Sequence, residues 1–514
     1  MMSLSRNNLQ NIDPTPKVFL PTEAVFNKPE KVLQFGTGVL LRGLPDFMIS
    51  HANNKGLFNG RIVIVKSTNG GGDADAFNRQ NGLYTVCVRG LEGDKKIEEI
   101  HLCASVSRVL TAATEWDDIL QCAENPDMEI VISNTTEVGI TFVKDNIHAT
   151  PPISFPGKLL SFLYRLFKFF NKDVEKGMVI IPTELVPDNG DKLLSIVLEI
   201  AHQNGLETAF IDWLETCNHF CNSLVDRIVP GKLSAAEQLK IENELGYKDE
   251  LMIMSEVYAL WAIETSSEKV KKVLSFVQAN DGIILAKNID KFRELKLRLL
   301  NGSHTFSCGL AFLAGFTTVK EAMENEHFSL YLKKLMYNEI IPSIVSDEIT
   351  AEEAKVFADK VLDRYRNAFI DHQWLSISAQ YSSKMYLRNS AVIEDYYKRF
   401  HTVPSLMALG MAGHILFMRS EKEHNGSYYG NSNGTKYLVT DANAALFAEK
   451  WKVYRRDFLV SNIFEDKDIW QTNFNLFPGF AEEVTEQLNL LKEKGALVAL
   501  EYAAKEINPV INEK

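Results

Sequence analysis

The sequence predicts an α/β domain with a parallel sheet, followed by a mainly α-helical domain. Residues 31–65 contain a short apolar run, a glycine turn, a helical pattern and a second apolar run, which is the order of a strand–helix–strand unit. Two later apolar runs of strand length, 128–133 and 178–181, alternate with helical segments, and this alternation favours parallel strands with helices on both faces. From about residue 285 onward, helical patterns dominate and strand-like runs become rare.

Each predicted element of the first domain has a local signal. The continuous apolar runs at 31–35 and 61–65 predict buried strands, and the segment 44–58 between them predicts a helix. Pro182 closes the last of the strand-length runs. The segment 154–170 has helical periodicity with basic residues on one side, and we expect it to cover the sheet rather than to lie on a membrane surface.

The change of pattern near Asp281-Gly282 predicts the domain boundary, with a sheet-containing domain at 25–283 and a mainly helical domain at 284–514. The turn-rich segment 420–437 is expected to be an exposed loop. The helical patterns of the second domain occupy 289–316, His327–Ile344, 351–370 and 441–461.

Length and charge limit the class of protein. A chain of 514 residues is too long for one compact core, so we expect two domains or more. The 67 acidic residues outnumber the 55 basic ones, which argues against a nucleic-acid partner but not against a small anionic substrate. The N-terminus lacks the apolar region of a secretory signal, and no apolar stretch approaches the ~20 residues that span a bilayer. We therefore expect a soluble, cytoplasmic protein.

Six cysteines suit free thiols in a reducing compartment. Cys217, His219 and Cys221 place three soft ligands within five residues, but a zinc site needs three or four ligands that converge. No second pair of cysteine or histidine residues stands nearby, so plain packing is favoured over metal binding.

The glycine turn predicts dinucleotide binding. Gly36 and Gly38 follow a buried strand and precede a helix, where they would allow the close backbone approach that a pyrophosphate requires. The usual third glycine is Leu41 here, and Gly43 falls two residues late, so a purely structural turn is the alternative. The candidate cofactor-binding residues in this turn are Gly36, Thr37, Gly38, Val39 and Leu40.

The end of the second strand leaves the choice of cofactor open. An acidic residue at this position would bind the ribose 2′-hydroxyl and repel a 2′-phosphate. The sequence there is Val65-Lys66-Ser67-Thr68, with no Asp or Glu. NAD and NADP therefore both remain possible from this feature.

Two further segments contain candidate polar residues. Asn222–Pro230 includes the adjacent Asp226 and Arg227, which on physical grounds alone are best explained as a structural ion pair in a turn. In the second segment, Lys296, Asn301 and His304 fall on one predicted helix.

On a regular helix Asn301 and His304 share a face, whereas Lys296 is offset from His304 by roughly 80° and lies ~12 Å along the axis. Carbonyl reduction needs a proton donor at the oxygen, and a lysine with a depressed pKa can supply it. Asparagine amides can stabilise the developing oxyanion. The alternative is a basic helix face with an ordinary cap.

Together these segments resemble the mannitol dehydrogenase family of long-chain, metal-independent polyol dehydrogenases. The signature Phe220–Pro230 is almost completely similar to that of the family, and Lys296, Asn301 and His304 match its K-x-x-x-x-N-x-x-H pattern. The N-terminal turn, extended to Arg42, matches its G-x-G-x-x-x-R pattern, which implies that Arg42 is a further cofactor-binding residue. The resemblance covers roughly residues 28 to 490 and implies a Rossmann-type N-terminal domain, a mainly helical C-terminal domain and no metal.

Within the family, three segments are most similar to the branch that reduces keto-uronates: Ser133–Glu137, Ile181–Leu185 and Phe369–Ser378. Thr183-Glu184-Leu185 replaces the C-D-N run of mannitol dehydrogenases, which argues against mannitol as substrate. Asn189 is the candidate for a second oxyanion amide, and Arg298 and Lys384 are candidates for contacting the substrate.

The resemblance implies NAD-dependent, reversible reduction of D-tagaturonate to D-altronate, with Lys296 as general acid and base. The alternatives are fructuronate reductase or mannitol 2-dehydrogenase activity within the enzyme class, or a non-catalytic dinucleotide-binding sensor. The complete set of Lys296, Asn301 and His304 argues against a sensor, which needs no proton donor. The oligomeric state is left open.

Overall fold

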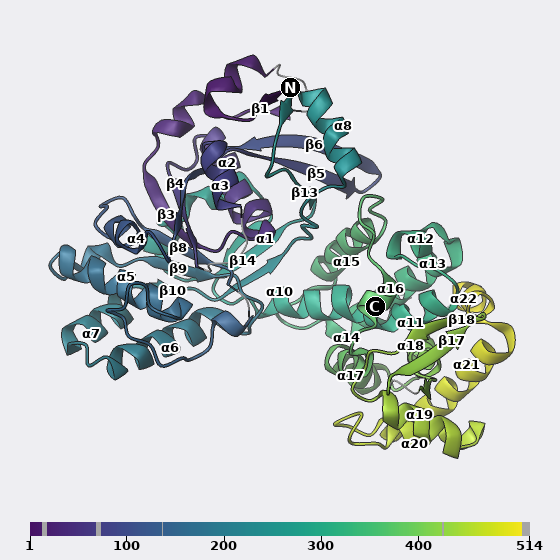
Figure 1. The fold of residues 1–514 in the computed structure, drawn as a ribbon. Coiled ribbons are helices and arrows are strands. Elements are labelled where there is room, and N and C mark those ends of the chain that lie inside the picture. The colour runs from purple at the N-terminus through teal and green to yellow at the C-terminus, as the bar shows by residue number, and fades with distance from the viewer. Residues whose placement is uncertain (13–17, 68–72, 136, 424–425, 506–514) are drawn as a thin grey trace. The chain divides into compact units, whose positions relative to one another are not determined.

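The computed structural model describes residues 1–12, 18–67, 73–135, 137–423 and 426–505. The chain forms two compact units (Figure 1). The first contains residues 1–90 and 96–290, and the second contains residues 91–95 and 291 onward. In Figure 1 the first unit runs from purple to teal along the chain, and the second from green to yellow.

A six-stranded parallel sheet forms the centre of the first unit. Its strand order is β10-β9-β8-β3-β4-β7, and every neighbouring pair is parallel. From β3 the chain builds outward first through β4 and β7, then returns to add β8, β9 and β10 on the other side. The strands are β3 (Glu30–Phe35), β4 (Arg61–Lys66), β7 (Val106–Thr111), β8 (Ile130–Ser133), β9 (Val179–Pro182) and β10 (His219–Phe220).

Both faces of this sheet are buried, because successive side chains of each strand enter different cores. In β3, Val32 belongs to one hydrophobic cluster, whereas Leu33 and Phe35 belong to the other. The first cluster contains side chains of α1 (Val39–Gly43) and α2 (Pro45–Asn54). The second contains side chains of α5 (Phe155–Phe169), α6 (Asn189–Gln203) and α7 (Thr208–Cys217). The predicted α/β architecture is confirmed.

The basic segment 154–170 is a helix that covers the sheet. Ser154 caps α5, and its hydroxyl accepts a hydrogen bond from the Gly157 amide at 3.0 Å. Leu159, Phe162 and Leu166 lie in the core beneath it. None of the described helices is long and apolar enough to cross a membrane.

Smaller sheets complete the first unit. Their strands mix polar and apolar residues, and the hydrophobic pattern did not predict them. Their strands are β13 (Ile253–Glu256), β5 (Tyr84–Glu92), β6 (Lys95–Cys103) and β2 (Val18–Phe19) in one sheet, β11 (Ser223–Asp226), β14 (Leu260–Glu264) and β15 (Ile283–Ala286) in a second, and β1 (Met2–Ser3) with β12 (Tyr247–Lys248) in a third.

The second unit is helix-rich, as predicted, and two of its helices contain π-helical turns. One π segment, η6 (Lys296–Gly302), joins α10 (Asp290–Leu295) to α11 (Ser303–Leu313). The other, η7 (Leu335–Ile340), joins α13 (Glu326–Lys334) to α14 (Ile341–Ile344). The remaining long helices are α15 (Ala351–Tyr365), α17 (Tyr381–Phe400), α18 (Ser405–Phe417), α19 (Ala444–Val453), α20 (Arg456–Phe464), α21 (Phe480–Lys494) and α22 (Ala496–Lys505).

The expectation of an exposed loop at 420–437 is wrong. Within this segment the strands β16 (Glu421–Lys422), β17 (Tyr428–Ser432) and β18 (Thr435–Leu438) pair antiparallel. Asn433 and Gly434, with φ of 52° and 81°, form the two-residue connection that such a hairpin favours. The Asn-Gly pair was the signal in the sequence.

Candidate active site

The glycine turn after β3 has one position that requires glycine and one that leaves space. Gly36 has φ +126°, and a Cβ there would lie 2.9 Å from the Asn134 carbonyl oxygen and 2.9 Å from Leu41 Cδ1. Gly38 has ordinary backbone angles, and a Cβ there would meet no atom within 4 Å. Gly36 therefore shapes the turn, and Gly38 keeps its outer side open. Thr37, Val39 and Leu40 are partly exposed beside it.

The late glycine, Gly43, has a packing role. A Cβ at Gly43 would lie 2.8 Å from both methyl carbons of Val229. Arg227 Nη1 donates to the Gly43 carbonyl oxygen at 2.6 Å, and its Nη2 donates to the Glu256 carbonyl oxygen at 2.8 Å. The signature segment 220–230 thus packs directly against α1 and holds the helix that follows the glycine turn.

Arg42 points into the protein. Its side chain is buried, and its guanidinium donates to the Leu251 carbonyl oxygen at 2.8 Å and to Asp73 at 3.0 Å. These bonds anchor α1 to the rest of the first unit. Arg42, which is predicted to bind the cofactor, is therefore placed where its buried hydrogen bonds stabilise the glycine turn.

Polar side chains meet at the carboxyl ends of β8 and β9. The buried Glu184 carboxylate accepts hydrogen bonds from the Ser133 hydroxyl at 3.0 Å and from the Thr135 amide at 2.8 Å. Burial raises the pKa of Glu184, although these hydrogen bonds oppose the shift. The edge where sheets of this kind bind ligands thus contains a carboxyl group that sequence reasoning did not single out.

Asn189 is fully buried at the start of α6. Its Nδ2 donates to the carbonyl oxygens of Pro182, Glu184 and Ser223 at 3.0–3.1 Å, and its Oδ1 accepts from the Ser223 amide. These contacts tie β9 to β11. They favour a positioning role, because both amide hydrogens already have acceptors.

The described residues at the end of β4 do not distinguish NAD from NADP. The strand ends at Lys66, which is partly exposed, and Ser67 follows it. Thr68 lies outside the described residues.

The second candidate cluster is on the π segment η6 in the second unit. Five residues along an α-helix correspond to a rotation of roughly 140°, so Lys296 and Asn301 would point apart on a regular helix. In a π-helix the hydrogen bond joins residues five apart, which brings such residues to nearly the same side. The sequence predicts a regular α-helix here, but the structure has a π-helix. We therefore expect Lys296 and Asn301 to lie toward one side of η6.

Neighbouring side chains hold the π segment through three consecutive carbonyl oxygens. The Tyr365 hydroxyl donates to Leu300 O at 2.8 Å, Arg388 Nη1 donates to Asn301 O at 3.4 Å, and Asn389 Nδ2 donates to Gly302 O at 3.3 Å. Side-chain bonds of this kind stabilise a local departure from the α-helical ladder. For the Asn301 side-chain amide, no hydrogen-bond partner is found among the described residues.

His304 is buried and neutral. Its ring stacks on Tyr365 with centroids 4.0 Å apart and contacts His372 edge-on at 5.3 Å. Its Nε2 is buried and has no hydrogen-bond partner in the described structure. Burial, followed by the nearby positive charges of other side chains, lowers the pKa of His304 well below its usual value. A neutral imidazole nitrogen is thus left to bind an outside group.

Two predicted substrate residues have different surroundings. Arg298 donates to Glu294 at 2.7 Å and to the carbonyl oxygens of Leu387 and Arg388, so it ties η6 to α17. Lys384, on α17, is half-buried, and its Nζ donates only to the Ile377 carbonyl oxygen at 2.9 Å within the described chain.

The members of the cysteine cluster differ in burial, since Cys217 and His219 are partly exposed. Cys221 is buried, and its Sγ contacts the His219 carbonyl oxygen at 3.8 Å. Across the described ranges, no group of three or more His, Cys, Asp or Glu side chains is arranged to hold a metal ion.

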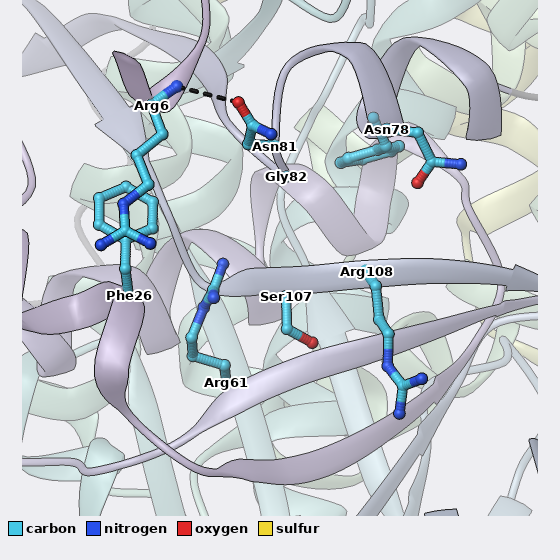
Figure 2. A pocket seen from close by; sticks show the side chains of 9 residues that line it. Arg6, Phe26, Arg61, Asn78, Asn81, Gly82, Ser107 and Arg108 are labelled. Atoms are coloured by element: carbon cyan, nitrogen blue, oxygen red, sulfur yellow. Dashed lines mark hydrogen bonds between the residues drawn. The ribbon is translucent and has the colours of Figure 1, made fainter. Parts of the chain in front are cut away.

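A separate pocket of about 250 Å³ lies at the amino ends of β4 and β7 (Figure 2). Arg6, Arg61 and Arg108 line it, and Figure 2 shows Arg6 lying along the Phe26 ring. Arg6 is paired with a glutamate, and Arg108 is paired with Glu30 at 3.0 Å. Ligands of open parallel sheets bind at the carboxyl ends of the strands, so this pocket is distinct from the glycine turn.

Comparison with known proteins defines the class. The sequence matches the Mannitol dehydrogenase Rossmann domain over residues 30–274 and the Mannitol dehydrogenase C-terminal domain over residues 288–492. With its glycine turn in the first unit and its lysine-bearing helix in the second, the chain belongs to the mannitol dehydrogenase family.

Relatives named altronate oxidoreductase are similar over nearly the whole chain. One from Halalkalibacterium halodurans is 34% identical over 488 residues, covering 93% of this chain and 94% of the relative. One from Escherichia coli is 34% identical over 476 residues, covering 91% of this chain and 95% of the relative.

Solved structures show the same fold. They include Pseudomonas fluorescens mannitol 2-dehydrogenase in a ternary complex with NAD and D-mannitol, with a TM-score of 0.66, 20% identity, and coverage of 98% of this chain and 100% of that one. A D-sorbitol dehydrogenase in substrate-free form has a TM-score of 0.76 and 20% identity, with coverage of 97% and 100%.

The geometry of the turn predicts that Gly38→Val weakens cofactor binding without harming the fold. A Cβ at this position meets no atom within 4 Å, and the valine methyl groups would enter the space proposed for a pyrophosphate. We expect a roughly tenfold or larger rise in the dissociation constant for NADH, measured by fluorescence titration, with an unchanged melting temperature. Gly36→Ala should instead lower the melting temperature. Unchanged NADH affinity in Gly38→Val would exclude the turn from the cofactor site.

The buried Asp46 predicts a pH-dependent stability. It accepts a hydrogen bond from Gln34 at 3.2 Å, its Oδ1 has no partner in the described structure, and burial raises its pKa from 3.8 to about 7. The folded state therefore holds a proton that the unfolded state has lost between about pH 4 and pH 7, so stability falls as pH rises through this window.

In thermal unfolding between pH 5 and pH 8, Asp46→Asn should lose less stability than the wild type, because its amide does not titrate. Asp75→Asn, at an exposed position, is the control and should follow the wild type. Parallel melting curves for wild type and Asp46→Asn would show that Asp46 does not titrate in this range.

Proposed function

We propose that this chain is an NAD-dependent oxidoreductase that interconverts D-tagaturonate and D-altronate by hydride transfer. The observation that supports this most is the 34% identity, over more than nine tenths of the chain, to relatives named altronate oxidoreductase. Each predicted domain would bind one reactant: residues 25–283 would bind the cofactor, and residues 284–514 would bind the substrate.

The first unit fits a dinucleotide. Gly36 admits the tight turn, and the open side of Gly38 at the start of α1 leaves room for phosphates. Arg42 stabilises the turn by its hydrogen bond to the Leu251 carbonyl oxygen, and Arg227 does so by its hydrogen bond to the Gly43 carbonyl oxygen. When bound, NADH supplies the hydride that reduces the keto carbon. NAD is proposed over NADP because the similar mannitol 2-dehydrogenase was solved with NAD.

In the second unit, each residue on η6 and α11 has a proposed role. Lys296 donates the proton to the carbonyl oxygen during reduction and accepts it in the reverse direction. The Asn301 amide stabilises the charge that builds on this oxygen. The neutral His304 orients the substrate through its unpartnered Nε2.

Asn189 and Arg298 are assigned supporting roles. Asn189 was predicted as a second oxyanion amide, but the hydrogen bonds of its side chain support the positioning of the sheet edge beside the cofactor site. Those of Arg298 likewise support the positioning of η6 against α17. Lys384 remains a proposed substrate contact.

The partner implied is a small sugar acid, with no nucleic acid, and the proposed location is the cytoplasm. Fructuronate reductase or mannitol 2-dehydrogenase activity would use the same proton-transfer residues, so substrate assays must separate them. A dinucleotide-binding sensor would have no use for Lys296 beside Asn301. Oxidation of NADH, measured separately with D-tagaturonate, D-fructuronate and D-fructose, distinguishes these enzyme activities, and a sensor would oxidise NADH with none of them.

The substrate assignment predicts a preference for charged substrates. Followed by the absorbance of NADH, kcat/KM should be higher for D-tagaturonate than for D-fructuronate, and higher for either than for the uncharged D-fructose. Equal efficiency on D-fructose and on the keto-uronates would contradict the assignment while leaving membership of the family intact.

The role of Lys296 predicts a loss of proton transfer. Lys296→Ala should reduce kcat by roughly 10²–10⁴, the usual contribution of general acid–base catalysis. NADH affinity should be nearly unchanged, because the glycine turn belongs to the other unit. Small primary amines should partly restore the rate, since they can carry the proton. Normal turnover with an unaltered pH profile would assign the proton to another group.

A further inference from the structure

Arginine and lysine side chains of two elements outside its own helix, α15 and α17, lie near His304, as does the His372 ring. Burial and then His372, Arg364, Arg388 and Lys384 lower its pKa, so these four groups lie within its electrostatic reach. His372 follows α15, and Lys384 and Arg388 lie on α17. The chain as a whole is acidic, with a formal charge of -12, which makes a local concentration of positive charge notable.

Arg388 has most of its hydrogen-bonding capacity unused. Its Nη1 donates to the Thr305 hydroxyl at 3.1 Å and to the Asn301 carbonyl oxygen at 3.4 Å. A guanidinium has five N–H donors on three nitrogens. Within the described residues, no carboxylate pairs with Arg388, and no bond is found from its Nε or Nη2. Since the side chain is half-buried, these donors are held in a fixed place.

Lys384 stands one helical turn before Arg388 on the same face of α17. Like charges at this spacing destabilise a helix, and within the described residues Lys384 pairs with no carboxylate either. Lys398, on the same helix, pairs with both Glu394 and Asp395. Lys384 and Arg388 therefore differ from this surface lysine because neither forms a salt bridge with a carboxylate among the described residues, although the negative charge of Asp441 acts on Lys384.

We propose that Arg388, assisted by Lys384, binds the carboxylate of the sugar-acid substrate. This rests on the proposed function and deepens it. A guanidinium can hold both oxygens of a carboxylate through two parallel N–H donors, which a hydroxyl at the same end of a polyol cannot match. Arg388 also donates a hydrogen bond to the backbone carbonyl oxygen of Asn301. This bond links the residue proposed to bind the carboxylate to the residue whose amide is proposed to stabilise the oxyanion.

The phosphates of the cofactor are the other anions that could meet these cations. The two sources make different predictions. If Arg388 and Lys384 bind the substrate carboxylate, their replacement changes the selectivity between charged and uncharged sugars. If they bind phosphate, their replacement changes the dissociation constant for NADH.

The test compares wild type, Arg388→Gln and Arg388→Lys with keto-uronate and with an uncharged ketohexose. The ratio of kcat/KM for D-tagaturonate to that for D-fructose should fall roughly 10- to 100-fold in Arg388→Gln, the size expected for loss of a charge-assisted hydrogen bond. Arg388→Lys should recover part of it. The loss should lie mainly in KM, and NADH affinity should not change. Lys398→Gln, on the same helix, is the matched control and should keep the wild-type ratio.

Each other outcome has a distinct meaning. If wild type prefers keto-uronates and Arg388→Gln keeps that preference, the inference is wrong and the proposed function stands. If Arg388→Gln instead raises the dissociation constant for NADH with selectivity unchanged, the cations bind cofactor phosphate. If wild type reduces only uncharged ketoses, both proposals are overturned. Should Arg388→Gln fail to fold, Lys384→Gln has to show the same fall in selectivity.

Discussion

The contact between η6 and α17 is the constraint on which the second unit depends. A Cβ at Gly302 would lie 2.7 Å from Asn389 Oδ1, so any larger residue would have to displace the Asn389 side chain from this contact. Asn389 donates to the Gly302 carbonyl oxygen, and Arg298 donates to the carbonyl oxygens of Leu387 and Arg388 from the other side. These bonds run in both directions and fix the register of the two helices.

This register has chemical consequences. It places the residue proposed to bind the carboxylate, Arg388, beside the carbonyl oxygen of Asn301, whose amide is proposed to stabilise the oxyanion. It also supports the π turn that brings Lys296 and Asn301 to one side. π turns are rare and occur frequently at functional sites. The backbone distortion and the arrangement of the polar groups are thus one feature rather than two.

In the first unit, too, glycines allow two segments to approach closely, and polar side chains then bond to the backbone there. Gly36 allows the turn to approach the Asn134 carbonyl oxygen, and Gly43 allows α1 to approach Val229. Buried arginines then complete the arrangement, since Arg42 donates from α1 to the Leu251 carbonyl oxygen and Arg227 donates to the Gly43 carbonyl oxygen of α1. Arg227 is buried, and burial lowers its pKa to about 10.

Much of this could be predicted from the sequence because it depends on local pattern. Continuous apolar runs identified the central strands, and the match of Lys296, Asn301 and His304 to a spaced motif indicated the family. The Asn-Gly turn at 433–434 was an available local signal that the polar composition around it obscured.

The rest depends on contacts between distant segments. The π turn arises from Tyr365, Arg388 and Asn389, which lie more than sixty residues away, so a helical period in the sequence implies a regular helix instead. Asn189 and Arg298 have suitable chemistry for a site, and only their partners reveal that their donors are engaged. Arg388 matched no motif, and what distinguishes it is the lack of a carboxylate partner among the described residues, which no sequence pattern records.

A crystal structure of the ternary complex with NAD and D-altronate tests the roles of Lys296, Asn301 and Arg388 most directly. We expect the reacting hydroxyl of D-altronate to lie within hydrogen-bond reach of Lys296 Nζ and the Asn301 amide, roughly 2.6–3.2 Å. We also expect the carboxylate of the same molecule to lie against the guanidinium of Arg388. A sugar acid bound with its reacting hydroxyl away from Lys296, or with its carboxylate held by other residues, would contradict these roles.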